Sequence, residues 1–271
     1  MIFASDLDQT LIYSQRSKGS DCAESMLIPV ETKNGQTVSY IAVQALSLLQ
    51  ELSERAMFVP VTTRTIEQYQ RIHLFQEQIK PKYAVTSNGG HILIDGVADP
   101  NWHDAIRRNL EHSCTPSDQV RRLFHEIATP DWVSAERFCD GLFYAFLIQR
   151  DRLPIAEMQG LAAELDALGW DTSVQGRKVY LVPRVVSKRD ALVYLQELEG
   201  KTVRFASGDS LLDRCMLDVA EHAFVPRHGE LYREHQGRSD QAPVVYRFTE
   251  GSGALAAVEI LQAISDLLNG S

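Results

Sequence analysis

The sequence predicts an α/β protein in which an open parallel sheet, covered by helices on both faces, is interrupted by an inserted α+β domain. At both ends of the chain, short apolar runs alternate with segments of helical periodicity, which is typical of a Rossmann-like core. Between about residues 91 and 184 the order changes to helix, strand, strand, helix, strand, strand (αββαββ). We therefore expect a first core segment (1–90), an inserted cap domain (91–184) and a second core segment (185–271).

The first core segment contains two β-α units. Their apolar residues recur near helical spacing between short apolar runs. The expected strands are Ile2–Ser5, Met57–Val61 and Tyr83–Thr86, and the expected helices are Ile41–Leu52 and Ile66–Ile79.

A long connection follows the first strand, and it contains Asn34-Gly35 between two apolar runs. Asn-Gly readily supplies the positive φ angles of a tight hairpin turn. The pattern predicts a two-stranded flap over about residues 26–41, with a mobile surface loop as the alternative.

The inserted segment has its own pattern of helices and hairpins. A helix near 120–127 precedes a strand pair that turns at Asp140-Gly141. A second helix begins at Pro154 and ends at Gly169, with proline and glycine at the ends where they are favoured. The two expected strand pairs are Trp132–Cys139 with Leu142–Gln149, and Trp170–Val174 with Lys178–Val182.

The pattern of the core then returns. Ser187 is a candidate N-cap for a helix that ends at Gly200. We expect strands at Thr202–Ala206, Ala223–Val225 and Val244–Phe248, a helix at Leu211–Val219, a loop at Arg227–Ala242, and a last helix through Leu261, Ile264 and Leu268.

Composition excludes several classes of protein. The 271 residues carry 27 Lys+Arg against 36 Asp+Glu, a net charge of −9, so the chain has no general attraction to nucleic acid or to an anionic membrane. The four cysteines form no C-x-x-C motif, and the sequence shows neither a secretory signal nor a membrane span. We expect a cytoplasmic protein, a monomer or small homo-oligomer, with a small-molecule substrate.

Polar residues gather after four of the expected strands. Ligands of open α/β sheets bind at the carboxyl ends of the strands. There the chain places two carboxylates after the first strand and hydroxyls and an arginine after the second. An amide and a glycine follow the third strand, and two carboxylates follow the fourth. A lysine is at the start of the helix that precedes the fourth strand. The residues are Asp6, Asp8, Thr10, Thr62, Thr63, Arg64, Asn88, Gly89, Lys188, Asp209 and Asp213.

Carboxylates gathered at one point raise each other's pKa unless cations neutralise them. Oxygen ligands of this kind select Mg²⁺ over zinc, and Mg²⁺ held by carboxylates beside a phosphate is recurrent in phosphoryl transfer. The residues therefore indicate a magnesium-assisted reaction at phosphorus.

These motifs resemble those of the haloacid dehalogenase-like (HAD) hydrolase superfamily. The D-x-D-x-T motif is matched at Asp6, Asp8 and Thr10, the second-motif threonine at Thr62, the third-motif lysine at Lys188, and G-D-x-x-x-D at Gly208, Asp209 and Asp213. An insert between the second and third motifs resembles the capped branch that contains sugar-phosphate phosphatases. Thr63, where the branch commonly has glycine, and Leu212, where it often has asparagine, depart from the pattern.

The resemblance implies roles for the matched residues. Asp6 would be the nucleophile that becomes phosphorylated, and Asp8 the acid and then the base. Thr62 and Lys188 would hold the transferring phosphoryl group, with Thr10, Thr63, Arg64, Asn88 and Gly89 as further substrate- or phosphate-binding candidates. Mg²⁺ would be bound by Asp6, the Asp8 carbonyl and Asp209, with Asp213 in contact or just behind.

The predicted function is a Mg²⁺-dependent phosphatase acting on a small phosphorylated metabolite, in particular a sugar phosphate. The alternatives are a sugar phosphomutase that uses the same nucleophile and a non-catalytic regulatory module that keeps the fold. Candidate specificity residues on the predicted hairpins of the cap are Arg137, Tyr144, Arg177 and Tyr180.

Overall fold

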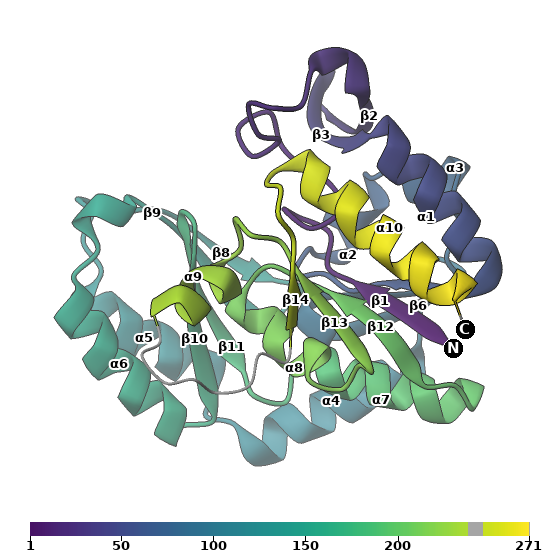
Figure 1. Ribbon diagram of the computed structural model, residues 1–271. Helices are drawn as coiled ribbons and strands as arrows, with labels where there is room; N and C mark the ends of the chain where they lie inside the picture. Colours follow the sequence, from purple (N-terminus) through teal and green to yellow (C-terminus); the bar gives the residue numbers. More distant parts are fainter. Residues whose placement is uncertain (238–245, 271) are drawn as a thin grey trace.

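The computed structural model describes residues 1–237 and 246–270, and these form a central parallel sheet with helices on both sides (Figure 1). Neighbouring strands of this sheet are parallel and lie in the order β14-β13-β12-β1-β4. Their bounds are β1 (Ile2–Ser5), β4 (Met57–Pro60), β12 (Val203–Ser207), β13 (His222–Val225) and β14 (Tyr246–Phe248). The predicted fold class is confirmed.

One edge of the sheet continues through a single parallel bridge between Val61 and Val85. That bridge brings β5 (Tyr83–Thr86) beside β4, and β6 (His91–Ile94) and β7 (Val97–Ala98) follow antiparallel to it. The limits 91–184 of the inserted domain stay a prediction, and within them β6 pairs with β5.

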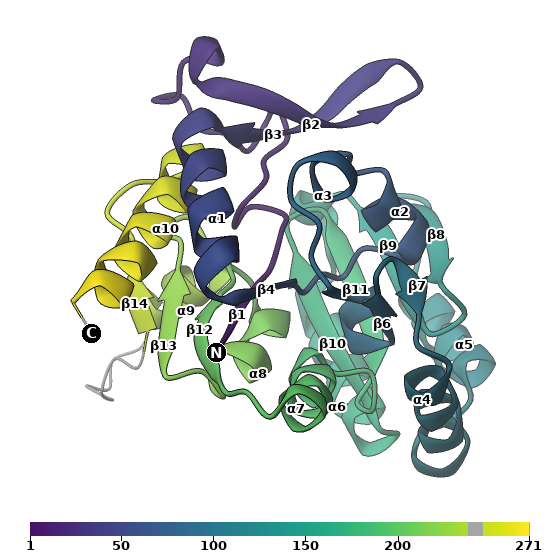
Figure 2. The ribbon, with the colours of Figure 1, turned by 90° about the vertical axis from the view of Figure 1, so that its right-hand side faces the viewer.

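Helices cover both faces of the sheet (Figures 1 and 2). The helices α1 (Val43–Arg55) and α10 (Ala254–Asn269) pack over Phe3, whereas α7 (Lys188–Glu199) and α8 (Arg214–Leu217) cover the opposite face, with Ile2 and Ala4. All four residues of β1 are buried, as expected for a parallel strand covered on both sides.

The predicted flap is present as a hairpin of β2 (Leu27–Lys33) and β3 (Gln36–Ala42), after a short 3-10 turn η1 (Glu24–Met26). Asn34 and Gly35 both have positive φ, 52° and 75°, which is the geometry that the Asn-Gly pair predicts.

The inserted segment contains a four-stranded antiparallel sheet in the order β10-β11-β9-β8, with two helices on one face. We refer to residues 117–183 as the cap unit. Its elements are α5 (Ser117–Ile127), β8 (Val133–Cys139), β9 (Phe143–Ile148), η3 (Arg150–Arg152), α6 (Ile155–Ala167), β10 (Trp170–Gln175) and β11 (Lys178–Pro183). The predicted order αββαββ is therefore observed, and α4 (Pro100–Ser113) precedes it.

Three local expectations were wrong. The helix expected at Ile66–Ile79 is divided into α2 (Ile66–Gln70) and α3 (Leu74–Glu77), because the main chain at Ile72 forms an antiparallel bridge with Glu31 of the flap. The helix expected at Leu211–Val219 is a 3-10 turn, η4 (Leu211–Asp213), followed by the short α8.

The third concerns the loop expected at Arg227–Ala242. It contains a helix, α9 (Glu230–Gly237), and residues 238–242 of that prediction lie outside the described residues. In α9 only Leu231 is buried, so the apolar periodicity that identifies a helix is almost absent.

Two composition-based expectations concern membranes and cysteines. Among the described residues, no helix combines the length and the apolar character that a membrane crossing requires. All four cysteines are free.

Candidate active site

The parallel sheet brings the predicted residues to one edge. Asp6 follows β1, Thr62 follows β4, and Asp209 follows β12, while Lys188 is the first residue of α7. The main-chain N–H of Asp6 donates to the carbonyl of Ser207 at 2.8 Å, which joins the ends of β1 and β12. Strands that run in the same direction thus place carboxylates from distant parts of the sequence side by side.

A buried lysine joins two of these carboxylates. Lys188 is fully buried, and its Nζ donates to Asp6 Oδ1 at 2.8 Å, to Asp213 Oδ1 at 2.5 Å and to the carbonyl of Val61 at 3.2 Å. Burial lowers the pKa of Lys188, but Asp213 and Asp6 raise that pKa by more, so the ammonium stays charged.

Asp213 has both of its oxygens engaged. Its Oδ2 accepts hydrogen bonds from the Asp209 N–H at 3.1 Å, the Ser210 N–H at 2.9 Å and the Ser210 hydroxyl at 2.8 Å. A Cβ at Gly208 would lie 2.5 Å from Asp213 Cβ, so glycine is needed there for the close approach. Asp213 therefore holds the loop that carries Asp209, and it pairs with Lys188.

Three carboxylates form a group that fits a hard cation. One oxygen each of Asp6, Asp209 and Asp213 lies within 4.8 Å of the others, and all three residues are buried. Burial raises the pKa of Asp6 to about 7 and that of Asp209 well above its ordinary range, and Asp213 adds to both shifts. Three carboxylates exceed the single positive charge of Lys188, so the residues suit a divalent ion with oxygen ligands.

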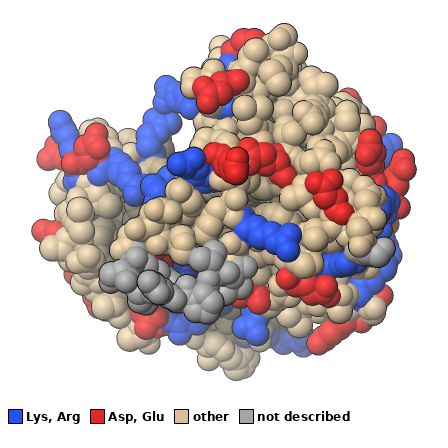
Figure 3. All heavy atoms as spheres, viewed as in Figure 1, with Lys and Arg blue, Asp and Glu red and all other residues tan. Residues whose placement is uncertain are grey.

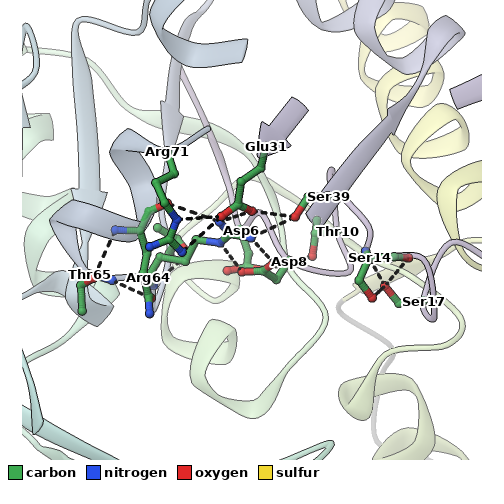
Figure 4. A network of polar contacts seen from close by, with 12 residues as sticks. Asp6, Asp8, Thr10, Ser14, Ser17, Glu31, Ser39, Arg64, Thr65 and Arg71 are labelled. Atoms are coloured by element: carbon green, nitrogen blue, oxygen red, sulfur yellow. Dashed lines mark hydrogen bonds and ion pairs between the residues drawn. The ribbon is translucent and has the colours of Figure 1, made fainter. Parts of the chain in front are cut away.

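Asp8 lies outside that group and faces solvent on one side. Arg64 donates from Nε to Asp8 Oδ2 at 2.7 Å and from Nη2 to Asp8 Oδ1 at 2.8 Å (Figure 4). Desolvation raises the pKa of Asp8, but the charge and hydrogen bonds of Arg64 outweigh it and lower that pKa. The two hydrogen bonds from Arg64 thus hold the carboxyl group of Asp8 in one orientation at the mouth of the site.

The Ser87-Asn88-Gly89 turn (η2) lies between the end of β4 and the start of α7. Asn88 donates from its main chain to the Thr62 carbonyl at 2.9 Å and from Nδ2 to the Val186 carbonyl at 3.0 Å. Asn88 Oδ1 is buried without a hydrogen-bond partner among the described residues. The turn fixes Thr62 and the start of α7 relative to each other.

Three further predicted residues lie at the same edge. The Thr10 hydroxyl approaches Asp6 Oδ2 at 3.4 Å, and the Thr62 hydroxyl accepts from the Arg64 N–H at 3.1 Å. Thr63, between Thr62 and Arg64, is half-buried. The structure therefore brings all eleven residues predicted for the site to one end of the sheet.

The cap unit presents one sheet face to this edge. Tyr180 pairs with Ala145, which pairs with Arg137, and paired residues share a face. Tyr180 belongs to the apolar cluster shared with the core, whereas Tyr144 is buried against the helices of the cap unit. Of the four candidate residues on the hairpins, Arg137 and Tyr180 are therefore on the core-facing side, Tyr144 is not, and Arg177 lies in the β10–β11 turn.

Two residues of the cap unit that sequence reasoning missed lie close to the core site. Lys178 shares the face of Tyr180, and its positive charge helps to lower the pKa of Asp8 after the larger effects of desolvation and Arg64. Asp140 accepts from the Ile66 N–H at 3.0 Å and from the Ser87 hydroxyl. Figure 3 shows Lys and Arg side chains gathered near the notch where the cap unit meets the core. The alternation along β11 could have identified Lys178, because it lies two residues before Tyr180.

The chain was compared with family models, curated proteins and solved structures. A family model described as sucrose-6F-phosphate phosphohydrolase matches residues 1–262. No match was found among curated proteins.

Several solved structures share the fold at low sequence identity. The sucrose-phosphatase of Synechocystis sp. PCC6803, in complex with sucrose and phosphate, is 17% identical with a TM-score of 0.69, covering 98% of this chain and 97% of that one. A subclass IIB sugar phosphatase of the HAD superfamily is 12% identical with a TM-score of 0.56 and 98% of each chain covered. A haloacid dehalogenase-like hydrolase of Bacillus subtilis is 12% identical with a TM-score of 0.53, and the match covers 97% of this chain and 91% of that one.

Proposed function

Because the chain belongs to the sucrose-6F-phosphate phosphohydrolase family and is thus a phosphoric monoester hydrolase of the HAD superfamily, we propose that it hydrolyses a small phosphorylated sugar through a phosphorylated Asp6. The observation that supports this most directly is the buried Lys188 between Asp6 and Asp213, with Asp8 held separately by Arg64. A nucleophile and a proton donor are thus two residues apart in different environments.

In the first half-reaction, an oxygen of Asp6 attacks phosphorus and the bond from phosphorus to the sugar oxygen breaks. Asp8 donates a proton to that leaving oxygen, so the sugar departs as a neutral alcohol. In the second, Asp8 takes a proton from a water molecule, which attacks phosphorus and releases Asp6 and inorganic phosphate.

The transferring group needs donors for its equatorial oxygens. The Thr62 hydroxyl would supply one of these donors, and the positive charge of Lys188 would be held in a fixed position beside it, so little reorganisation is needed in the transition state. The charge of Lys188 is already shared by two carboxylates. A further cation is therefore needed to balance a phosphate dianion.

Mg²⁺ would meet that need, since it neutralises the carboxylates and a phosphate oxygen when bound. Asp6, the main-chain carbonyl of Asp8 and Asp209 would hold it. Asp213 would act from behind, because Lys188 and the Asp209–Ser210 loop occupy both of its oxygens.

The sugar would lie between Asp8 and the core-facing side of the cap unit, near Lys178 and Tyr180. The predictions of a cytoplasmic location, of a monomer or small homo-oligomer, and of no nucleic-acid partner belong to the same proposal.

Release of inorganic phosphate from sucrose 6F-phosphate is the direct test, measured with Mg²⁺, with EDTA, and with Mg²⁺ restored. We expect phosphate release that EDTA abolishes and Mg²⁺ restores. Full activity after exhaustive chelation would reject the metal site. Conversion of a hexose 1-phosphate to its 6-phosphate without free phosphate would identify a phosphomutase instead.

A further inference from the structure

Glu31, a carboxylate of the flap, is connected to the catalytic edge through Arg64. We propose that Glu31 is a positioning residue, which fixes the guanidinium of Arg64 and thereby the direction in which Asp8 presents its carboxyl group. This inference rests on the proposed function, in which Asp8 is the proton donor.

The carboxylate of Glu31 is fully buried and surrounded by donors. Its Oε2 accepts from Arg64 Nη1 at 2.8 Å and from the Ser39 hydroxyl at 2.8 Å, and its Oε1 accepts from Arg71 Nε at 3.3 Å. Figure 4 shows the row of charged groups, in which the guanidinium of Arg64 lies between Glu31 and Asp8 and Arg71 also contacts Glu31. Negative and positive groups alternate along this row, so each charge in it has a partner of opposite sign.

A distortion of the flap directs Glu31 into this row. Successive side chains of a regular strand point to opposite faces, yet Val30 and Glu31 are both fully buried. The register of β2 against β3 shifts on both sides of Glu31, and Glu31 pairs with Ile72 across a separate bridge. Such bulges re-aim a side chain and are frequent beside active sites.

The planar shape of the Arg64 guanidinium fixes the directions in which it contacts Glu31 and Asp8. The guanidinium is a rigid plane, and here Nε and Nη2 face Asp8 while Nη1 faces Glu31. Fixing the Nη1 side therefore sets the plane against which Asp8 aligns. The side chain of Arg64 is only 11% exposed, so water does not compete strongly for these donors.

A comparison of two substrates with different leaving groups distinguishes a positioning role of Glu31 from a purely structural one. p-Nitrophenolate departs with little help from a proton, whereas phenolate needs more help. A misdirected Asp8 therefore slows phenyl phosphate more than p-nitrophenyl phosphate, whereas a smaller folded fraction slows both equally. The ratio of the two kcat/KM values is thus independent of how much enzyme is folded.

The experiment measures this ratio for wild type, Glu31→Gln and the control Glu67→Gln. Glu67 also pairs with Arg71, but its side chain is 86% exposed and it lies outside the row that joins Glu31, Arg64 and Asp8. Turnover of p-nitrophenyl phosphate by the wild type first establishes the phosphatase activity on which this inference rests. For Glu31→Gln we expect kcat/KM for phenyl phosphate to fall about tenfold further than for p-nitrophenyl phosphate, with no change of the ratio in Glu67→Gln.

Two further variants complete the test. Ser39→Ala, which removes one hydrogen bond to Glu31 and a longer one that Ser39 accepts from Arg64 Nη2, should change the ratio in the same direction by a smaller factor. In an Asp8→Asn background, Glu31→Gln should cause no further change of the ratio, because residues that act through one group are not additive. An unchanged ratio in Glu31→Gln, or an additive effect in Asp8→Asn, would mean that Glu31 only anchors the flap.

Discussion

Burial of Asp6 favours its protonated carboxyl group, whereas the proposed metal ion binds the ionised form. Burial raises its pKa from 3.8 to about 7, so between these pH values the folded protein binds more protons than the unfolded chain. Stability therefore falls as pH rises through this window. Mg²⁺ binds the ionised carboxylate, so bound Mg²⁺ should offset the loss of folding stability near the upper limit of this pH window.

The expected result is a Mg²⁺-dependent rise in Tm that is small near pH 5 and grows toward pH 7.5. Asp6→Asn, which has no ionisable group at this position, should show a much weaker dependence of the Mg²⁺ effect on pH. Thermal unfolding with and without Mg²⁺ across this range measures both. A rise in Tm that is equally large at pH 5 and pH 7.5 would contradict the proposed coupling.

Asp6 and Asp8 should also differ in what their amides do to catalysis. Asp6→Asn should abolish phosphate release, because an amide does not form the acyl phosphate. Asp8→Asn should lower kcat/KM for a sugar phosphate by about 10²–10⁴-fold, the usual contribution of proton transfer, and kcat/KM for p-nitrophenyl phosphate by much less. The kcat should fall for both esters, because Asp8 also activates the water in the second half-reaction. Steady-state kinetics on both esters checks this, and wild-type rates on the sugar phosphate in Asp8→Asn would assign the proton to another group.

Among the elements, the η2 turn and the flap turn allow a matched comparison of glycines. Gly89 has φ +100°, and a Cβ there would lie 2.2 Å from the Ser187 carbonyl oxygen, at the start of the helix that carries Lys188. Gly35 has φ +75°, and a Cβ there would meet no described atom within 4 Å. The two turns share the conformational requirement, but they differ in the space available for a side chain.

Gly35→Ala should therefore cost about 1–2 kcal/mol of stability, from the positive φ alone. Gly89→Ala should cost about 1–3 kcal/mol more from overpacking, and it should also lower kcat by displacing Lys188. Urea unfolding and phosphate release measure the two effects. Equal losses of stability and unchanged kcat in Gly89→Ala would show that α7 and η2 are not closely coupled.

The elements also show what the sequence could and could not predict. The strands of the core, the Asn34-Gly35 hairpin and the Ser187 cap follow from local periodicity and turn chemistry, and the structure has them. The break at Ile72 does not, because it comes from pairing with the distant Glu31. In the site, motif spacing predicted which residues meet, but not that Arg64 links Asp8 to the flap, because a bulge directs Glu31 inward against the alternation of its strand.

For the whole molecule, the cap unit and the core share an apolar cluster that includes Tyr180 and Phe143 from the cap unit and Val59 and Val61 from the core. Asp140 adds a polar connection to α2 and η2. The matched catalytic motifs all lie in the core, so the cap unit would contribute by binding the part of the substrate that does not react. Binding energy of that kind orients the phosphorus and raises the rate of the true substrate.

The two faces of the cap sheet should therefore differ in their effect on specificity. Lys178→Gln and Arg137→Gln, on the core-facing side, should lower kcat/KM for the sugar phosphate about tenfold or more. The kcat/KM for p-nitrophenyl phosphate should change little, because this ester is too small to use remote contacts. Tyr144→Phe is the matched control, since Tyr144 lies on the same sheet but packs against the cap helices, and it should leave the ratio of the two kcat/KM values unchanged. Parallel kinetics on both esters gives that ratio for each variant. If Lys178→Gln and Arg137→Gln lower kcat/KM for both esters in equal proportion, the cap unit does not bind the sugar. The core edge or the flap would then have to select the substrate.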